Sequence, residues 1–168
     1  ELAITHTQEL IPIIKSIPEI KAASVRIKSA GLISSSESSA GVMIVGVDPR
    51  TEKNISSLSK RVQSGNFLDT NDQAIVIGAA LAKNLNVKLG EKVVLMGQAL
   101  DGSIASGAYR IQGLFDTGTE ELDKGLALIT HKAAQELFVM EQKTSEVVLR
   151  LDNALSAKKT AGIIKAKI

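Results

Sequence analysis

The stretch Y-R-I-Q-G-L-F-D-T-G-T-E-E-L-D-K, residues 109–124, decides the fold. Its first half alternates between apolar and polar side chains, so that Tyr109, Ile111 and Phe115 are expected on one side. A period of two is typical of a strand with one buried face. Gly113 falls on that apolar side, where a missing side chain predicts a bulge or a closely approaching backbone.

The second half of the stretch changes to turn chemistry. Asp116 to Thr119 reads D-T-G-T, with Gly118 suited to a turn, and the apolar pattern resumes only at Leu126. Between them lies an acidic segment of Glu120, Glu121 and Asp123. These carboxylates lack the regular spacing of a calcium loop, so the segment is interpreted as a solvated rim between two strands.

Bulk composition excludes several classes of protein. With 168 residues, 44% hydrophobic and 23% charged, the chain can form one medium-sized core or two small ones. An aromatic content of 2% and a net charge of +2 argue against a nucleic-acid partner, which needs exposed rings or a strongly basic surface. No run approaches the roughly 18 apolar residues that cross a bilayer.

Both ends of the sequence suggest a piece of a longer polypeptide. The chain starts at Glu1 without a methionine, and the helical spacing of apolar residues continues up to Ile168. We therefore expect further residues on either side of this domain.

Hydrophobic periodicity predicts an alternation of strands and helices. Strands are expected at 23–28, 42–47, 74–77, 92–96, 108–115, 126–129 and 147–151, and helices near 6–17, 55–62, 81–85, 130–138 and 153–168. Residues 31–40, rich in serine, are expected to form a loop. The predicted class is α+β, with a split βαβ subdomain formed by 1–47 and 124–168 and a small, mostly β subdomain inserted at 48–123.

One connection predicts a β-hairpin. Gly97 to Gly107 contains Asp101-Gly102, a strong turn signal between two strands. The candidate partner-binding residues of this tip are Gln98, Leu100, Asp101, Gly102 and Ile104. The two aliphatic side chains either face a partner or fold back onto their own subdomain.

Motifs for catalysis are missing from the sequence. It contains no P-loop, no G-x-S-x-G and no cysteine, and its two histidines, His6 and His131, are far apart. We therefore predict no enzymatic activity, no metal and no cofactor. A hydrolase with an unrecognised site is the less favoured alternative.

Several motifs in one order resemble the extracytoplasmic domain of ABC-transporter permeases of the MacB and lipoprotein-releasing type. Besides residues 109–124, they are G-V-D-P at 46–49, I-G-A-A-L-A at 77–82, L-G-E-K-V at 89–93 and L-A-L-I-T-H-K-A-A-Q-E-L-F at 126–138. The positions matching the family pattern are Gly46, Asp48, Pro49, Gly78, Gly90, Gly113, Phe115, Gly118 and Asp123.

The resemblance implies a porter-like fold and a non-catalytic role. Such a domain lies outside the cytoplasm, attached to the cell membrane through helices at 6–17 and 153–168. It engages a lipoprotein, peptide or drug while a cytoplasmic ATPase subunit moves it against a second permease copy, with an extracytoplasmic carrier or adaptor as a further possible partner. The alternative is a regulatory or scaffold domain without transport.

Two short segments and Asp123 indicate which branch of that family the chain resembles. Residues 115–118 and 134–138, with Asp123, are more similar to the lipoprotein-releasing branch than to the drug-efflux branch. The hairpin at 97–107 departs from that branch, because it is short and has no proline.

Overall fold

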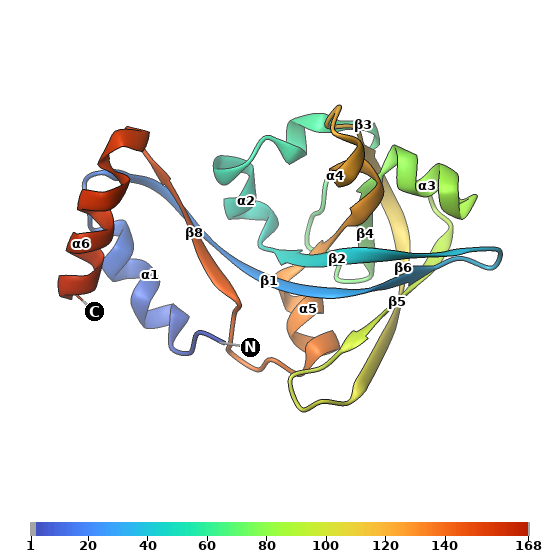
Figure 1. The fold of residues 1–168 in the computed structure, drawn as a ribbon, viewed down its shortest axis with the longest axis horizontal. Helices are drawn as coiled ribbons and strands as arrows, with labels where there is room; N and C mark the ends of the chain where they lie inside the picture. Colours follow the sequence, from blue (N-terminus) through green and yellow to red (C-terminus); the bar gives the residue numbers. More distant parts are fainter. Residues whose placement is uncertain (1–2, 168) are drawn as a thin grey trace.

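The computed structural model describes residues 3–167 as strands and short helices wrapped into one body with a protruding pair of helices (Figure 1). The strands are β1 (Ile20–Ser34), β2 (Ser39–Val47), β3 (Val62–Gly65), β4 (Ala74–Gly78), β5 (Lys92–Gln98), β6 (Ile104–Phe115), β7 (Leu126–Thr130) and β8 (Glu146–Leu151). The α-helices are α1 (Thr7–Lys15), α2 (Pro49–Ile55), α3 (Ala79–Leu85), α4 (Glu120–Gly125), α5 (His131–Phe138) and α6 (Ala157–Lys167), with 3₁₀ turns η1 (Leu58–Arg61) and η2 (Ala154–Ser156).

Six of the strands close into a ring. The hydrogen-bonded order is β2-β7-β4-β6-β5-β1, and β1 pairs again with β2, so the sheet has the connectivity of a barrel. Two strands lie outside this ring, with β3 on β6 and β8 on β1. The predicted α+β class is confirmed.

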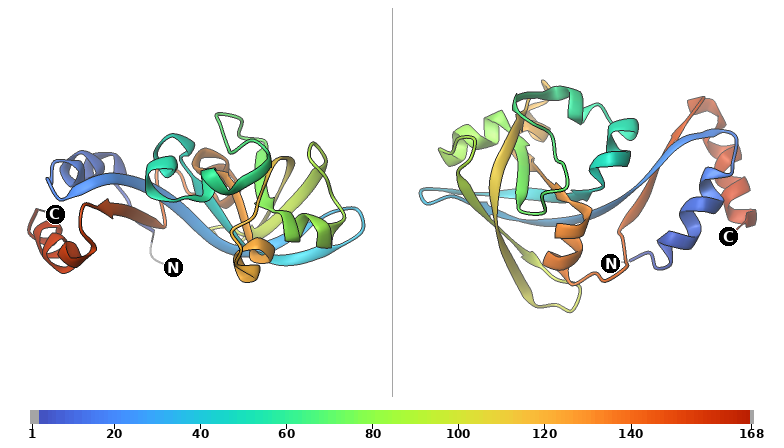
Figure 2. Two further views of the ribbon diagram at one scale, coloured as in Figure 1. Left: turned by 90° about the horizontal axis from the view of Figure 1, so that it is seen from above. Right: turned by 180° about the vertical axis from the view of Figure 1, so that it is seen from behind.

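The long strand β1 belongs to both parts of the molecule. Its residues 26–34 pair with β2, its residues 31–34 also pair with β5, and its residues 20–26 pair with β8. Figure 2 shows the strand leaving the barrel and reaching α1 and α6 at the far end. We call β8, α1, α6 and residues 20–26 of β1 the stalk.

Apolar side chains form three clusters. The barrel interior contains alternate residues of the six strands, and α3 and α5 contribute the buried Leu81, Leu85, Ala134 and Phe138. A second cluster on the outside of β2, β4 and β7 includes Val47, Leu68, Val76, Phe115 and Leu128. A third lies in the stalk, where Ile14, Ile17 and Ile20 pack with residues of β8 and α6.

The bulge predicted at Gly113 is present and moves Phe115 to another cluster than expected. Parallel pairing of β4 with β6 jumps from Ile75↔Ile111 to Val76↔Gly113, so Gln112 is an extra residue in β6. An extra residue reverses the alternation of side chains that follow it. Tyr109 and Ile111 therefore face the barrel interior, whereas Phe115 packs in the outer cluster, and the prediction of one shared side was wrong.

Two further predictions of local structure were wrong. Residues 31–34 continue β1 instead of forming a loop, and only Ser35 to Ser38 make the turn to β2, closed by the Ser35 N–H donating to the Ser38 carbonyl at 2.8 Å. The helix expected at 55–62 lies earlier, because the Asp48 side chain accepts from the Arg50 N–H and Pro49 begins the helix.

The division into 1–47 with 124–168 and 48–123 stays a prediction. Strands β2 and β7 come from the first part, and β4, β5 and β6 from the second, yet all five lie in the same ring. In the structure, the visible change of shape lies between the barrel and the stalk (Figure 2).

Polar contacts join α2 to the stalk. Arg26 donates to both carboxylate oxygens of Glu52, at 3.2 and 2.5 Å, and the Glu52 side chain is only 1% exposed. Glu146 of β8 lies 3.7 Å from Arg26. Because α2 follows directly after β2, these contacts hold the stalk in one orientation against the barrel.

Removing one partner of the Arg26–Glu52 pair should lower the free energy of unfolding more than removing both partners. Arg26→Met leaves a buried carboxylate without its partner, and such changes cost about 3–5 kcal/mol. Arg26→Met combined with Glu52→Leu should recover much of that loss, as measured by urea unfolding. If the single and double variants lose the same free energy of unfolding, the two side chains do not interact as a buried ion pair.

Gly78 is expected to tolerate no side chain. A Cβ there would lie 2.0 Å from the Asp123 carbonyl oxygen of α4, whereas a Cβ at Gly41 would meet nothing within 4 Å. We expect Gly78→Ala to lower the free energy of unfolding by about 1–3 kcal/mol through overpacking. Gly41→Ala is the control and should change it by less than about 0.5 kcal/mol. Equal stability of both variants would contradict the close approach of α4.

Candidate partner-binding surface

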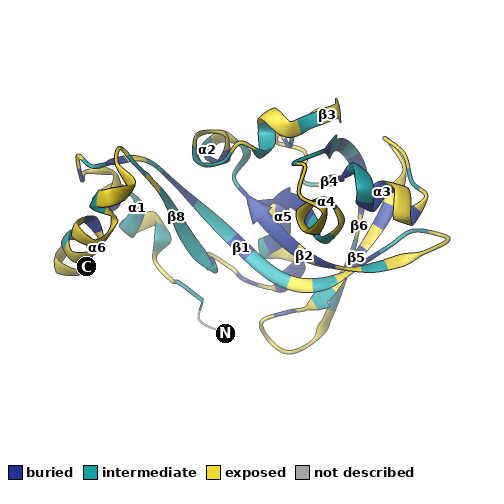
Figure 3. Ribbon diagram, turned by 45° about the horizontal axis from the view of Figure 1, so that its top comes forward, coloured by how far each residue is buried: buried dark blue, intermediate teal, exposed yellow. Residues whose placement is uncertain are grey.

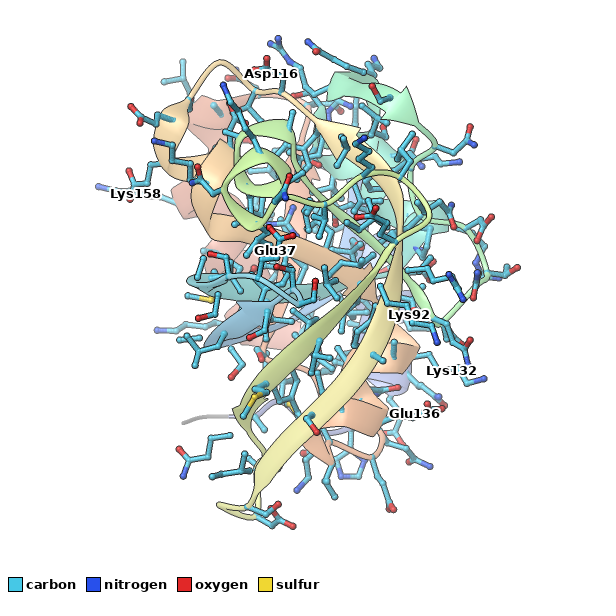
Figure 4. All side chains as sticks on the ribbon, turned by 90° about the vertical axis from the view of Figure 1, so that its right-hand side faces the viewer. Glu37, Lys92, Asp116, Lys132, Glu136 and Lys158 are labelled. Atoms are coloured by element: carbon cyan, nitrogen blue, oxygen red, sulfur yellow. The ribbon has the colours of Figure 1, made fainter. Side chains whose placement is uncertain are left out.

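The β5–β6 hairpin projects from the barrel past the end of α5 that carries Glu136 (Figure 4). Its strands pair up to Gln98↔Ile104, and the Ala99 N–H donates to the Ser103 carbonyl at 2.8 Å. The tip turns through Gly102, whose φ of 88° suits glycine. Asp101 Oδ1 accepts from the Ser103 hydroxyl at 2.6 Å and from its N–H at 2.9 Å, and these bonds lower the Asp101 pKa. The tip is a closed turn.

The two aliphatic side chains of the tip have different surroundings. Ile104 is 81% exposed and faces solvent. Leu100 is 41% exposed, its N–H donates to the Phe138 carbonyl at 2.9 Å, and it lines a cavity of about 30 Å³ with Phe138 and Met140. Leu100 therefore attaches the hairpin to the end of α5, and Ile104 remains available for contact.

Ile104 continues into an uncovered apolar face that was not predicted as a binding site. The outward residues of β2, β1, β5 and β6 lie in register: Met43 opposite Ala30, Leu32 opposite Met96, Ser34 opposite Val94, and Gln98 opposite Ile104. We call these eight residues the apolar sheet face. None of them is charged.

Its large side chains are substantially exposed, with Leu32 at 48%, Met43 at 43%, Val94 at 39% and Met96 at 38%. Figure 3 shows the exposed positions along these strands. Contiguous exposed apolar surface on a folded protein typically marks an interaction site. A signal was present in the sequence, since Val93 to Met96 is apolar on both faces, but periodicity cannot tell which of two apolar faces is uncovered.

Cations border this face at both ends. Lys28 follows it along β1 and lies 2.9 Å from Glu146. At the other end Lys92 opposes Arg110, and the Arg110 guanidinium donates to the Gly90 carbonyl at 2.9 Å. A partner with apolar side chains flanked by carboxylates complements such a surface.

The positions of the family pattern do not gather at the hairpin. They lie at element ends and close packing contacts, where Gly46 faces Ala134 of α5 and Gly113 faces the Asn66 carbonyl. Asp48 and Pro49 begin α2, and Gly90 and Gly118 occupy turns with positive φ.

Asp123 has a structural environment. Its side chain is buried, and one carboxylate oxygen accepts from the Thr117 N–H at 2.8 Å and hydroxyl at 2.7 Å. Burial works to raise the Asp123 pKa, but the Thr117 hydrogen bonds outweigh it and the pKa is lowered. Within residues 3–167, no group of three potential ligands could hold a metal ion.

Asp123 should therefore stabilise the fold in a pH-dependent way. Since its folded-state pKa lies below the usual value of about 3.9, the stabilisation is complete above that pH and is lost as pH falls through the folded-state pKa. Asp123→Asn should lower the free energy of unfolding by about 1 kcal/mol at pH 7, because a charged hydrogen bond is stronger than a neutral one. Urea unfolding at several pH values should show the difference shrinking in acid. A pH-independent difference would contradict this account.

The structure is a closed mixed sheet with α1 and α6 together at one end (Figure 1). The chain belongs to the MacB-like periplasmic core domain family, whose sequence profile matches residues 3–167.

Known proteins agree with this assignment. The chain is 26% identical over 144 residues to the lipoprotein-releasing system transmembrane protein LolC of Xylella fastidiosa strain Temecula1, covering 82% of this chain and 35% of LolC. The extracellular domain of the noncanonic ABC-type transporter YknZ from Gram-positive bacteria shares the fold with a TM-score of 0.68 at 18% identity, over 94% of this chain and 78% of that one. The periplasmic region of MacB from Actinobacillus actinomycetemcomitans gives a TM-score of 0.67 at 13% identity, and the match covers 99% of this chain and 75% of that one.

The match thus covers 35%, or about a third, of the length of the curated LolC relative. Within residues 3–167 no helix is both long and apolar enough to cross a membrane.

Proposed function

We propose that this chain is the extracytoplasmic domain of an ABC-transporter permease and docks an envelope partner through Ile104 and the apolar sheet face. The observation that carries the proposal is the exposed, uncharged surface on four neighbouring strands, in a chain of the MacB-like family. Its role is contact and movement, without chemistry of its own.

The stalk would connect this surface to the membrane. In the full permease, α1 and α6 continue toward membrane helices, while a cytoplasmic ATPase subunit and a second permease copy drive their movement. Because β1 runs unbroken from the stalk into the barrel, and Arg26 ties α2 to β8 and β1, a tilt of the stalk carries the barrel with it.

The class of cargo is proposed from the name of a relative. Lipoprotein release is the function in the name of the LolC relative, and we propose an envelope lipoprotein or its carrier as the partner here. The hairpin at 97–107 is short and has no proline, so a carrier would have to contact the sheet face as well as the tip.

Charges placed on the surface should abolish docking without unfolding the domain. Ile104→Asp and Leu32→Asp introduce carboxylates at exposed positions, where substitutions usually change stability by less than about 0.5 kcal/mol. In proteoliposomes containing the complete permease and its ATPase subunit, we expect ATP-dependent release of a triacylated lipoprotein to a carrier to be lost.

The matched control is Leu155→Asp in η2, between β8 and α6, where the side chain is 92% exposed. It should leave release unchanged. Normal release by the Ile104 and Leu32 variants would refute the docking surface, and a complete permease that releases nothing but still binds wall hydrolases would favour a regulatory domain instead.

A further inference from the structure

A groove lies on the outside of the barrel, separate from the hairpin. Helices α2 and α4 lie along the same side of β2 (Figure 3), and the groove between them has a volume of about 680 Å³. Its apolar lining comes from β2, β7, η1 and α4: Met43, Val45, Val47, Leu58, Leu122, Leu126 and Leu128. Leu122 of α4 and Met43 of β2 are each 43% exposed, so the groove opens to solvent along an apolar wall and floor.

The floor offers no backbone partners to a peptide. Strand β2 is hydrogen-bonded to β1 on one edge and to β7 on the other, and β7 is bonded to β2 and β4. An extended peptide needs a free strand edge for its own N–H and C=O groups, and leaving them unpaired against an apolar floor costs free energy. A hydrocarbon chain has no such groups.

Polar groups stand at the walls of the groove. Arg26, Lys28 and Arg61 bring three cations, against the carboxylates of Glu52 and Glu121. Glu52 is held by Arg26, whereas Arg61 forms no ion pair within the described part of the chain. The Ser56 hydroxyl lines the groove and is buried without a hydrogen-bond partner among the described residues. Arg26 and Lys28 are paired with Glu52 and Glu146, so among the described residues Arg61 is the lining cation that can bind an anionic end group.

The groove also connects with the surface described above. Met43 belongs to both, opposite Ala30 and next to Leu32. Within the groove, the outward Met43, Val45 and Val47 follow β2 for on the order of 13 Å, at about 3.3 Å per residue. This apolar line is continuous, so it suits an aliphatic chain.

We propose that the groove between α2 and α4 binds a single long aliphatic chain with an anionic end group, the chain against β2 and β7 and the end group near Arg61. This goes beyond the proposed function, because the ligand is a single free chain that the domain would hold away from water. The groove shares Met43 with the apolar sheet face but neither Ile104 nor Leu32, so the two proposals can fail separately.

The test uses hexadecanoic acid, below its micelle concentration, titrated into the 168-residue chain while backbone amide NMR signals are followed. Saturable shifts should cluster on β2, η1 and α4. Leu122→Glu places a charge against the chain and should weaken binding by at least about tenfold. The control Leu89→Glu changes a side chain with the same exposure of 43% outside the groove and should bind as wild type.

Two further measurements complete the test. One separates the contribution of the aliphatic chain from that of its end group, and the other separates the groove from the hairpin. Arg61→Gln should weaken hexadecanoic acid several-fold but leave hexadecanol unchanged, since the alcohol has no charge. Ile104→Asp should bind hexadecanoic acid normally, even though it is expected to lose docking. The proposal is overturned if Leu122→Glu binds as wild type, if the shifts lie elsewhere, or if a capped apolar heptapeptide competes more strongly than the acid.

Discussion

The structure depends on the pairing of β1. This strand has three different partners along its 15 residues, and it is paired on both edges at residues 31–34, by β2 and β5, and at Arg26, by β2 and β8. Its contact with β5 closes the ring of six strands, and its contact with β8 carries the sheet into the stalk. Closure gives each of the six ring strands a neighbour on both sides, whereas β3 and β8 are each paired on one side.

Closure also explains why apolar surface remains exposed. A barrel of this size has a filled interior, and the few helices of the chain cover its ends and the side of β2, β4 and β7. Nothing in residues 3–167 covers the outer face of β1 and β5, where Leu32 and Met96 oppose each other. The groove between α2 and α4 and the apolar sheet face therefore have the same cause. The ring has more outer surface than the helices can cover.

Local signals predicted much of this fold. The strand at 108–115, the Asp101-Gly102 turn and the bulge at Gly113 are present as expected, although the bulge places Phe115 on the other side from Tyr109 and Ile111. The helix α2 begins before the helix expected at 55–62, because Asp48-Pro49, directly after the strand at 42–47, provides an N-cap and a first-turn proline. The hairpin tip could be located from sequence, but the different surroundings of Leu100 and Ile104 could not, since they depend on the distant end of α5.

The sequence by itself determined the strand periods, the turns, the α+β class and the family pattern, because each depends on neighbours within a few residues. Only the tertiary structure decided which apolar faces stay exposed, that β1 closes the ring, and that Arg26 joins β1, α2 and β8. These features depend on pairings between residues far apart in the chain. Burial is a property of the assembled sheet, and an apolar strand such as β5 reads the same from its sequence whether one face or both are covered.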